Sequence, residues 1–407
     1  MNKKKESKVV PNVRFKGFTD DWKQRKLGDV CEVTMGQSPD GSTYSDEPSD
    51  YILVQGNADL KDGWVVPRVW TSQKTKTAQA GDLIMSVRAP VGAMGKTAYD
   101  IVIGRGVATI KGNEFIYQTL VKYDADGYWK KLAAGSTFES VNSNEVKGAI
   151  INVPQDIEEQ KKIGEYFLNL DHLITLHQQK ITRLIKLKKA MLEKMFPKKG
   201  SVIPEFRFNG FANAWEQRKL GDIADVTKLA GFEFTEHVVY SDEGNIIALR
   251  GLNIKNGQLI LDDVKYIDGS NFSKLSRSKL FINDIMFTYV GTVGEVAIIK
   301  ENDRFYLAPN VSRIRVKSDD SPKFISHYMR TDNFKNKVIF PLIATSSQPA
   351  LSMENIRKFT INIPINREEQ DYLAKYFDSL DHLINLHQRK LDMLKKLKSA
   401  CLSEMFI

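Results

Sequence analysis

An internal repeat divides this 407-residue chain into two similar halves. Phe15–Asp29 returns as Phe208–Asp222 at an offset of 193 residues. A longer match joins Ile151–Phe196 to Ile361–Phe406 at an offset of 210, and 25 of its 46 positions are identical. A match of this length and density does not arise by chance. It indicates a duplicated module, so the chain is expected to fold as two similar halves.

The interiors of the two copies are much less alike than their ends. Gly81–Met85 corresponds to Asn283–Phe287, and Gly92–Gly95 to Gly291–Gly294, but little else aligns. The second copy is also longer, because the offset grows from 193 to 210 between the matched ends. Constant ends around divergent interiors indicate two modules that perform one task on two different targets.

Each interior is expected to be an α+β globular domain. Short runs rich in β-branched residues, such as Tyr51–Val54, Leu83–Val87 and Ile246–Leu249, are typical of strands. The pairs Asp62-Gly63 and Asn256-Gly257 are typical of tight turns between strands. Few long apolar patterns of helical period interrupt these runs.

The repeated ends are expected to form two long helices. From Glu158 to Phe196 apolar residues recur at steps of three and four, and the second copy repeats the pattern. A helix of this length extends for roughly 58 Å, since each residue adds about 1.5 Å. A lone helix cannot bury so long a stripe. We expect the two helices to pack against each other as a coiled coil; the alternative is that each helix lies on its own domain.

Composition narrows the class of protein only a little. No apolar stretch approaches the ~20 residues that a membrane span needs, and no signal peptide is recognisable, so we expect a cytoplasmic protein. Cys31 and Cys401 offer neither a metal spacing nor a disulfide framework. The net charge of +9 is spread out: residues 13–156 hold 17 Lys and Arg against 18 Asp and Glu, and residues 206–366 hold 21 against 18. Charge alone supports a nucleic-acid partner weakly.

The repeated motifs resemble the conserved regions of type I restriction–modification specificity subunits. The resemblance rests on Phe-x-Gly-Phe, Trp and Lys-Leu-Gly-Asp at the start of each copy, and on the stretch from Gly81 to Gly106. It also rests on the motif Pro-x-x-x-Glu-Glu-Gln at the entry to each helix, which stands at Pro154–Gln160 and at Pro364–Gln370. It covers nearly the whole chain.

The resemblance implies a DNA-specificity subunit that is not an enzyme. In that family two target-recognition domains each read one half of an interrupted site in double-stranded DNA. The long conserved helices pack as an antiparallel pair and dock two methylation subunits, which restriction or motor subunits join. We expect no cofactor on the chain itself, because S-adenosylmethionine, ATP and Mg belong to the partner subunits, and we expect no metal site and no membrane partner.

The expected fold class is α+β, with two globular α/β target-recognition domains separated by two long helices that pack as an antiparallel coiled coil. The segments are a basic N-terminal tail (1–12), target-recognition domain 1 (13–156), a central conserved helix (157–197), a linker (198–205), target-recognition domain 2 (206–366) and a distal conserved helix (367–407).

Motifs that would indicate catalysis are absent from the sequence. It has no Asn/Asp-Pro-Pro-Tyr/Phe segment of an adenine methylase, no glycine fingerprint for S-adenosylmethionine and no helicase loop. Gly92–Thr97 lacks the first glycine of a phosphate loop, since Pro90 stands there, so it indicates a turn between strands. His172 and His177, with their counterparts in the second copy, are five residues apart and point in different directions on a helix. We interpret them as helix-flank residues that hydrogen-bond across the pair.

Candidate DNA contacts are polar and cationic side chains near turns and strand ends, because such groups read base edges and phosphates. In domain 1 they are Gln37, Ser38, Gln55, Asn57, Lys74, Lys76, Arg88, Arg105, Ser136 and Thr137. In domain 2 they are Lys228, Arg250, Asn253, Lys274, Arg277, Lys279, Tyr289, Ser346, Ser347 and Gln348. Asn57 and Asn253, and likewise Arg88 and Tyr289, are expected at similar places in the two copies. For each residue the alternative is an ordinary solvated surface position.

A second function also fits the layout, namely a coiled-coil scaffold whose two globular heads bind protein or glycan. Divergent interiors in a constant frame favour DNA reading, because a scaffold gains nothing from exchanging its heads. Genes for an adenine methylase and an ATP-dependent nuclease beside this gene would separate the two functions.

Overall fold

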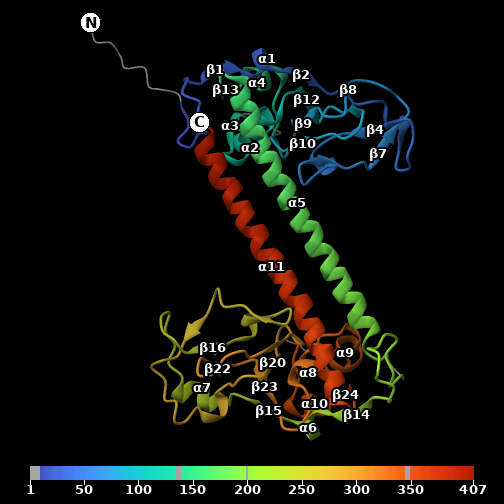
Figure 1. Ribbon diagram of the computed structural model, residues 1–407, viewed down its shortest axis with the longest axis vertical. Helices are drawn as coiled ribbons and strands as arrows, with labels where there is room; N and C mark the ends of the chain where they lie inside the picture. The colour runs from blue at the N-terminus through green and yellow to red at the C-terminus, as the bar shows by residue number, and fades with distance from the viewer. Residues whose placement is uncertain (1–9, 134–138, 199, 344–348) are drawn as a thin grey trace. The chain divides into compact units, whose positions relative to one another are not determined.

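The computed structural model describes residues 10–133, 139–198, 200–343 and 349–407 (Figure 1). It forms two compact units, which are Met1–Lys180 with His387–Ile407 and Ile181–Leu386, as far as these are described. We call them unit 1 and unit 2. Two long helices, α5 (Ile157–Lys194) and α11 (Arg367–Met405), each contribute residues to both units.

Unit 1 holds a two-stranded sheet β1-β13, a six-stranded sheet β2-β12-β9-β10-β6-β5 and a five-stranded sheet β3-β7-β4-β11-β8. The strands are β1 (Lys23–Lys26), β2 (Glu32–Met35), β3 (Tyr44–Ser45), β4 (Tyr51–Val54), β5 (Leu60–Lys61), β6 (Trp64–Val65), β7 (Val69–Thr71), β8 (Thr77–Ala78), β9 (Leu83–Ser86), β10 (Met94–Lys96), β11 (Ile101–Ile103), β12 (Val107–Lys111) and β13 (Ile150–Val153). The helices, besides those two, are α1 (Leu27–Val30), α2 (Glu114–Ala125), α3 (Tyr128–Ala133) and α4 (Ser143–Gly148), with the short turns η1 (Gly41–Thr43) and η2 (Asn57–Asp59).

Unit 2 repeats this plan with a two-stranded sheet β14-β24, a four-stranded sheet β15-β23-β20-β21, a three-stranded sheet β19-β16-β22 and a hairpin β17-β18. The strands are β14 (Glu216–Lys219), β15 (Ala224–Lys228), β16 (Ile247–Leu249), β17 (Ile254–Lys255), β18 (Gln258–Leu259), β19 (Lys265–Tyr266), β20 (Ile285–Thr288), β21 (Val296–Ile298), β22 (Phe305–Leu307), β23 (Val311–Val316) and β24 (Thr360–Ile363). The helices and helical turns are α6 (Leu220–Ile223), α7 (Gly231–His237), η3 (Gly251–Asn253), η4 (Ser276–Ser278), α8 (Pro322–Met329), α9 (Asp332–Phe334), η5 (Lys335–Ile339), η6 (Phe340–Leu342) and α10 (Met353–Arg357).

The two ends of each sequence copy lie side by side. In unit 1 β1 pairs antiparallel with β13, and in unit 2 β14 pairs in the same way with β24. The long helices begin directly after β13 and β24. Asp156 Oδ1 accepts the backbone N–H of Glu158 at 2.8 Å, and Asn366 Oδ1 accepts that of Glu368 at the same distance. These side-chain bonds satisfy free N–H groups at the helix starts.

Each helix entry buries a glutamate that pairs with the arginine directly before the opening motif. Arg14 donates to both carboxylate oxygens of Glu159, at 2.5 and 2.7 Å. Arg207 does the same to Glu369, at 2.6 and 2.7 Å. Each of the two glutamate side chains is only 1% exposed. In unit 2 the indole of Trp215 donates as well, at 3.3 Å. The arginine before the opening motif and the second glutamate of the Glu-Glu-Gln motif thus form the same contact in both units.

Within unit 1 the long helices run antiparallel. Tyr166 Oη on α5 lies 3.4 Å from Cys401 Sγ on α11, and further along α5 Asp171 accepts from Lys398 Nζ at 2.6 Å. The residue numbers rise along one helix as they fall along the other. Unit 2 contains the second copy of the same lysine–aspartate pair. The expected α+β class with antiparallel long helices is confirmed.

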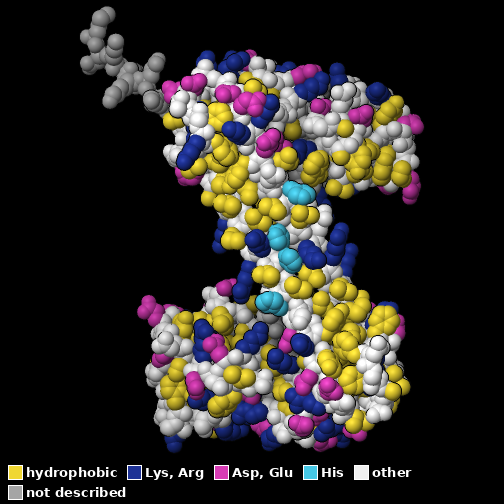
Figure 2. All heavy atoms as spheres, in the orientation of Figure 1, with side chains coloured by type: hydrophobic (Ala, Val, Ile, Leu, Met, Phe, Trp, Pro, Cys, Tyr) yellow, Lys and Arg dark blue, Asp and Glu magenta, His cyan; other side chains and the backbone are white. Residues whose placement is uncertain are grey.

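The helices leave apolar side chains exposed in both units (Figure 2). In unit 1 three leucines are between 42 and 46% exposed: Leu173, Leu176 and Leu397. In unit 2 their counterparts at the 210-residue offset are between 39 and 53% exposed: Leu383, Leu386 and Leu187. The residues of the helix stripe that face the cores, such as Phe167 and Leu380, are buried. The helices therefore carry a second apolar face besides the one that packs inside each unit.

The core of each unit is completed by the residues just past a long helix. Phe406, after α11, is buried in the core of unit 1, where its ring stacks on Phe115 with 5.2 Å between centroids. Phe196, after α5, is buried in the core of unit 2, 5.5 Å from Phe377. Aromatic side chains of this size contribute strongly to core stability. The repeated Met-Phe therefore serves as core sequence, which the helical pattern alone did not indicate.

Candidate nucleic-acid interface

Loops from separate parts of unit 1 meet where several strands end, and they hold most of the predicted contacts. The backbone N–H of Gln37 donates to the carbonyl of Ile103 at 2.8 Å. The neighbouring Ser38 Oγ accepts the backbone N–H of Arg105 at 3.2 Å. The N–H of Ile103 in turn donates to the carbonyl of Lys76 at 2.9 Å. The loops after β2, before β8 and after β11 are thereby fastened together.

A glycine brings two further loops into the same region. A Cβ atom on Gly106 would lie 2.0 Å from the carbonyl oxygen of Gln55, so only glycine permits this approach. The carbonyl of Gly106 accepts the N–H of Val87 at 2.9 Å, which places Arg88 beside the same loop. We call the region formed by residues 36–38, 55–57, 74–76, 87–88 and 104–106 the unit 1 loop cluster.

The side chains of this cluster are mostly exposed donors. The exposed ones among the predicted contacts are Gln37, Gln55, Lys74, Lys76, Arg88 and Arg105. Within the described ranges no ion pair involves the lysines or arginines of that set. Asn57 is half-buried at the start of η2, and Ser136 and Thr137 lie outside the described residues. Unpaired cations beside amide side chains are what base edges and phosphates require.

Unit 2 builds a corresponding cluster from different side chains. Lys228 ends β15 and places its Nζ 5.5 Å from the ring centroid of Tyr289, which follows β20. The N–H of Tyr289 donates to the carbonyl of Asn310 at 3.1 Å. Burial raises the pKa of the Tyr289 hydroxyl, which is therefore a neutral donor. Arg250 follows β16 and donates to Asp263 Oδ1 at 2.8 Å.

A hollow of about 750 Å³ opens beside Arg250. Its lining includes Lys255, Tyr240 and Asn310, none of which was predicted from the sequence. Asn310 has a backbone φ of +71° just before β23, a conformation in which asparagine is enriched. This asparagine before a strand is a signal that the sequence offered. Ser346, Ser347 and Gln348 lie outside the described residues.

Asn253 does not belong to the interface, contrary to the sequence prediction. Its side chain is fully buried, Nδ2 donates to the carbonyls of Ile260 and Asp263 at 2.9 and 2.7 Å, and Oδ1 accepts the N–H of Arg250. In unit 1 the same task of closing the turn falls to Asp59, which accepts the N–H of the residue after β4. Asn253 therefore corresponds to Asp59 and not to Asn57.

Two other predicted correspondences shift as well. The N–H of Tyr289 bonds to the loop before β23 just as that of Val87 bonds to the loop before β12, so Tyr289 corresponds to Val87. Arg88 then corresponds to Val290, and both make an isolated bridge to the segment that precedes the final helix of the domain. Similarly, Gly92 corresponds to Gly294, because each donates its N–H back to the last residue of the preceding strand. Both corrected correspondences have an offset of 202 residues, the same as that of Gly81–Met85 with Asn283–Phe287, so the errors arose because similar residue types were matched out of register.

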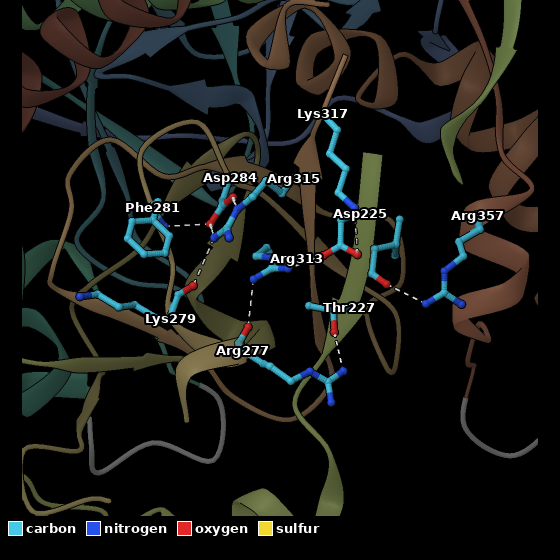
Figure 3. A network of polar contacts seen from close by, with 11 residues as sticks. Asp225, Thr227, Arg277, Lys279, Phe281, Asp284, Arg313, Arg315, Lys317 and Arg357 are labelled. Carbon is cyan, nitrogen blue, oxygen red and sulfur yellow. Dashed lines mark hydrogen bonds and ion pairs between the residues drawn. The ribbon is translucent and has the colours of Figure 1, made fainter. Parts of the chain in front are cut away.

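Arg277 and Lys279, two further predicted cations of unit 2, lie beside a polar network on one face of β15 and β23 (Figure 3). Arg315 donates to both oxygens of the buried Asp284, each at 2.7 Å, and Arg313 pairs with Asp225. Alternate residues of a strand point to the same face, so the two arginines lie on one side. Sequence reasoning missed both, although their spacing of two within a β-rich run was a signal.

Loop residues on this network are less firmly held. Arg277 donates to Thr227 Oγ1 at 3.3 Å, and its side chain is 67% exposed. Lys279 pairs with Asp303 at 2.6 Å, and Lys274 is exposed in the preceding loop. The corresponding face of unit 1 holds an exposed pair of Lys111 with Glu32 on β12 and β2. Cations are thus more concentrated on unit 2, in agreement with the charge count.

No group of three or more His, Cys, Asp or Glu residues in the described ranges is arranged to hold a metal ion. No helix among the described residues is long and apolar enough to cross a membrane. His177 and His387 meet across the helices of unit 1 with 3.0 Å between their Nδ1 atoms, which confirms the expected cross-helix contact. His172 and His382 are exposed.

The chain matches the family model described as the type I restriction modification DNA specificity domain over residues 19–186 and again over residues 213–396. Among curated proteins it is similar to the putative type I restriction enzyme MjaX specificity subunit of Methanocaldococcus jannaschii, with 29% identity over 183 residues, which cover 42% of each chain. It is also similar to the MjaVIII specificity subunit of that organism, with 22% identity over 402 residues, 94% of this chain and 92% of the relative.

A solved structure supports the same fold. The crystal structure of the type I restriction–modification system S subunit from M. genitalium superposes with a TM-score of 0.68 at 13% sequence identity. The match covers 98% of this chain and 99% of that one.

Proposed function

The chain belongs to the type I restriction–modification DNA specificity family, and we propose that it selects a two-part target in double-stranded DNA for partner subunits that methylate and cut. The observation that carries this proposal is the pair of loop clusters, one in each copy of the matched domain. Each cluster gathers donors at the ends of strands, and the surrounding frames are alike. Such a chain lends sequence selection to other proteins and needs no cofactor of its own.

The two clusters differ in their side chains, which supports an asymmetric target. Gln55 and Arg250 follow corresponding strands, yet an amide favours adenine and an arginine favours guanine. Arg88 corresponds to Val290, so a cation in one cluster is replaced by an apolar group in the other. Two readers with different donors select different half-sites. Because both are built on the same two helices, we infer a fixed gap between the half-sites.

The exposed leucines on the long helices support the docking of partners. Clustered apolar side chains on a helix surface usually mark a protein interface. They occur as two sets at the 210-residue offset, one in each unit, and so offer two similar surfaces. We propose that these surfaces dock two methylation subunits. Restriction or motor subunits then join the assembly.

Purified alone, the chain is expected to show no methyltransferase, nuclease or ATPase activity, because its sequence contains none of the methylase, S-adenosylmethionine or helicase motifs that such activities use. With its methylation subunit and S-adenosylmethionine it is expected to direct adenine methylation on duplex DNA. The measurement is transfer of labelled methyl groups to a plasmid, with each protein alone as the control. Activity of the chain by itself, or methylation without sequence preference in the complex, would contradict the proposal.

Removal of a base-reading arginine is expected to relax one position of the target. Losing a bidentate contact costs about 1–3 kcal/mol of discrimination. The preference for the correct base pair at one position should therefore fall by roughly 5- to 150-fold. Arg88→Ala tests unit 1 and Arg250→Ala tests unit 2. The readout is the methylated motif, and the matched control is Arg304→Ala, an exposed arginine that pairs with Glu301 outside both clusters. If both variants keep the affinity and the motif unchanged, these arginines are not in the interface.

A further inference from the structure

A hairpin of unit 2 lies between the candidate DNA hollow and the long helices. Strands β17 and β18 are joined by Asn256 and Gly257, which have φ angles of +53° and +84°. On one side Lys255 and Asn256 line the hollow beside Arg250. On the other side Gln258 Nε2 donates to Asn385 Oδ1 on α11 at 2.7 Å. Any tilt of this hairpin moves the hollow relative to the helices.

Arg330 fastens this hairpin to the helices. It caps the end of α8, and its side chain is only 11% exposed. Nη2 donates to the carbonyl of Asn256 at 3.0 Å, and Nη1 donates to Asp381 Oδ2 on α11 at 3.0 Å. The other oxygen of Asp381 pairs with Lys188 on α5. A single guanidinium thus joins α8, the hairpin and α11, and through Asp381 it reaches α5.

Charge and space both favour this arrangement. Burial opposes ionisation of Asp381, but Arg330 and Lys188 hold the pKa of its carboxyl below the usual value, so the carboxylate stays ionised. A Cβ atom on Gly257 would lie 2.0 Å from Cζ of Arg330. The turn therefore needs glycine both for its positive φ and for the close approach of the guanidinium.

Unit 1 repeats the contact with different groups. The Asp62-Gly63 turn also has positive φ angles, and a Cβ atom on Gly63 would lie 2.7 Å from Tyr117 Oη. Unit 1 also contains the counterpart of the Lys188–Asp381 pair, namely Lys398 with Asp171. In both units a glycine turn thus lies in close contact with a side chain next to the long helices, although the side chain differs between the units.

We propose that Arg330 is a positioning residue that fixes the hairpin of unit 2 on the long helices and so makes the complex selective for the gap between half-sites. This inference rests on the proposed function. Arg330 need not touch DNA for this role. A target-recognition domain that is held rigidly on the helices accepts one length of gap between the half-sites. A domain that can tilt on the helices also accepts gaps of neighbouring lengths.

The test uses the full chain in complex with its methylation subunit and S-adenosylmethionine. Duplexes carry unchanged half-sites with the natural gap, one base pair fewer or one more, and further duplexes carry one altered base in a half-site. Arg330→Gln is expected to reduce the preference for the natural gap by roughly tenfold, because small misplacements cost rate steeply. Discrimination against the altered bases is expected to stay unchanged. A general loss of stability would lower methylation of all duplexes alike and leave the gap preference intact.

Two more variants complete the test. Gln258→Ala removes only the contact with Asn385 and is expected to weaken the gap preference in the same direction, so it gives an answer even if Arg330→Gln does not fold. Arg304→Gln is the matched control and is expected to keep the preference of the parent chain. If Arg330→Gln folds and its gap preference is unchanged, the inference is overturned. If Arg330→Gln does not fold, an unchanged gap preference in Gln258→Ala overturns it. A parent complex without sequence-specific methylation overturns the proposed function instead.

Discussion

Arg207→Ala is expected to destabilise unit 2 by about 3–5 kcal/mol, because it leaves a buried carboxylate without its main partner. Glu369 is 1% exposed and accepts two bonds from Arg207. Once the guanidinium is gone, only the 3.3 Å bond from Trp215 remains among the described donors. Denaturant titration followed by tryptophan fluorescence measures the loss.

Arg207→Lys separates charge from geometry in this experiment. Lysine keeps the charge but cannot form the two parallel bonds, so an intermediate loss is expected. Arg304→Ala is the surface control, since its exposed pair with Glu301 should contribute less than about 1 kcal/mol. If Arg207→Ala costs no more than Arg304→Ala, the buried pair does not hold the opening motif to the helix.

Exchange of residues 13–150 for those of a relative with a different target is expected to replace one half-site and leave the other intact. The unit 1 loop cluster lies entirely within this segment, and the unit 2 loops that hold Lys228, Arg250 and Tyr289 lie outside it. Each wrong base pair costs about 1–3 kcal/mol, so two or more changed positions should lower methylation of the old target by roughly a hundredfold. The methylated motif is the readout.

The gap between half-sites is the internal control of this exchange, because α5 and α11 are retained. It is expected to stay the same. A change in both half-sites would show that the two clusters do not read independently, and the assignment of one half-site to each unit would be wrong.

The parts of the fold that the sequence predicted are those with a strong local or repeated signal. The long helices followed from an apolar stripe sustained over many turns, and their antiparallel packing followed from the resemblance. Arg14 and Arg207 also recur at the 193-residue offset, one position before the motif we recognised, so the repeat contained a signal that was overlooked. Local hydrophobic pattern and internal repetition were therefore enough to predict the long helices and the repeated ends of each copy.

The interface was harder to predict because it is built from long-range contacts. Exposed arginines and glutamines in loops were identifiable as donors, and the structure gathers many of those in unit 1. Burial could not be identified from the sequence. Asn253 is of a residue type that often contacts DNA, but its buried side chain closes a turn. Arg330 gives no sequence signal at all, since its partners Asn256 and Asp381 are 74 and 51 residues away. Correspondence between the copies also failed where similar residue types, such as Gly92 and Gly291, were matched out of register.

The most direct test of the central claim is a genome-wide map of methylated adenines in the host with this gene and without it. The account predicts one motif that depends on the gene, made of two unlike half-sites separated by a gap of fixed length. No gene-dependent motif, an uninterrupted motif, or two half-sites that form an interrupted palindrome would contradict it.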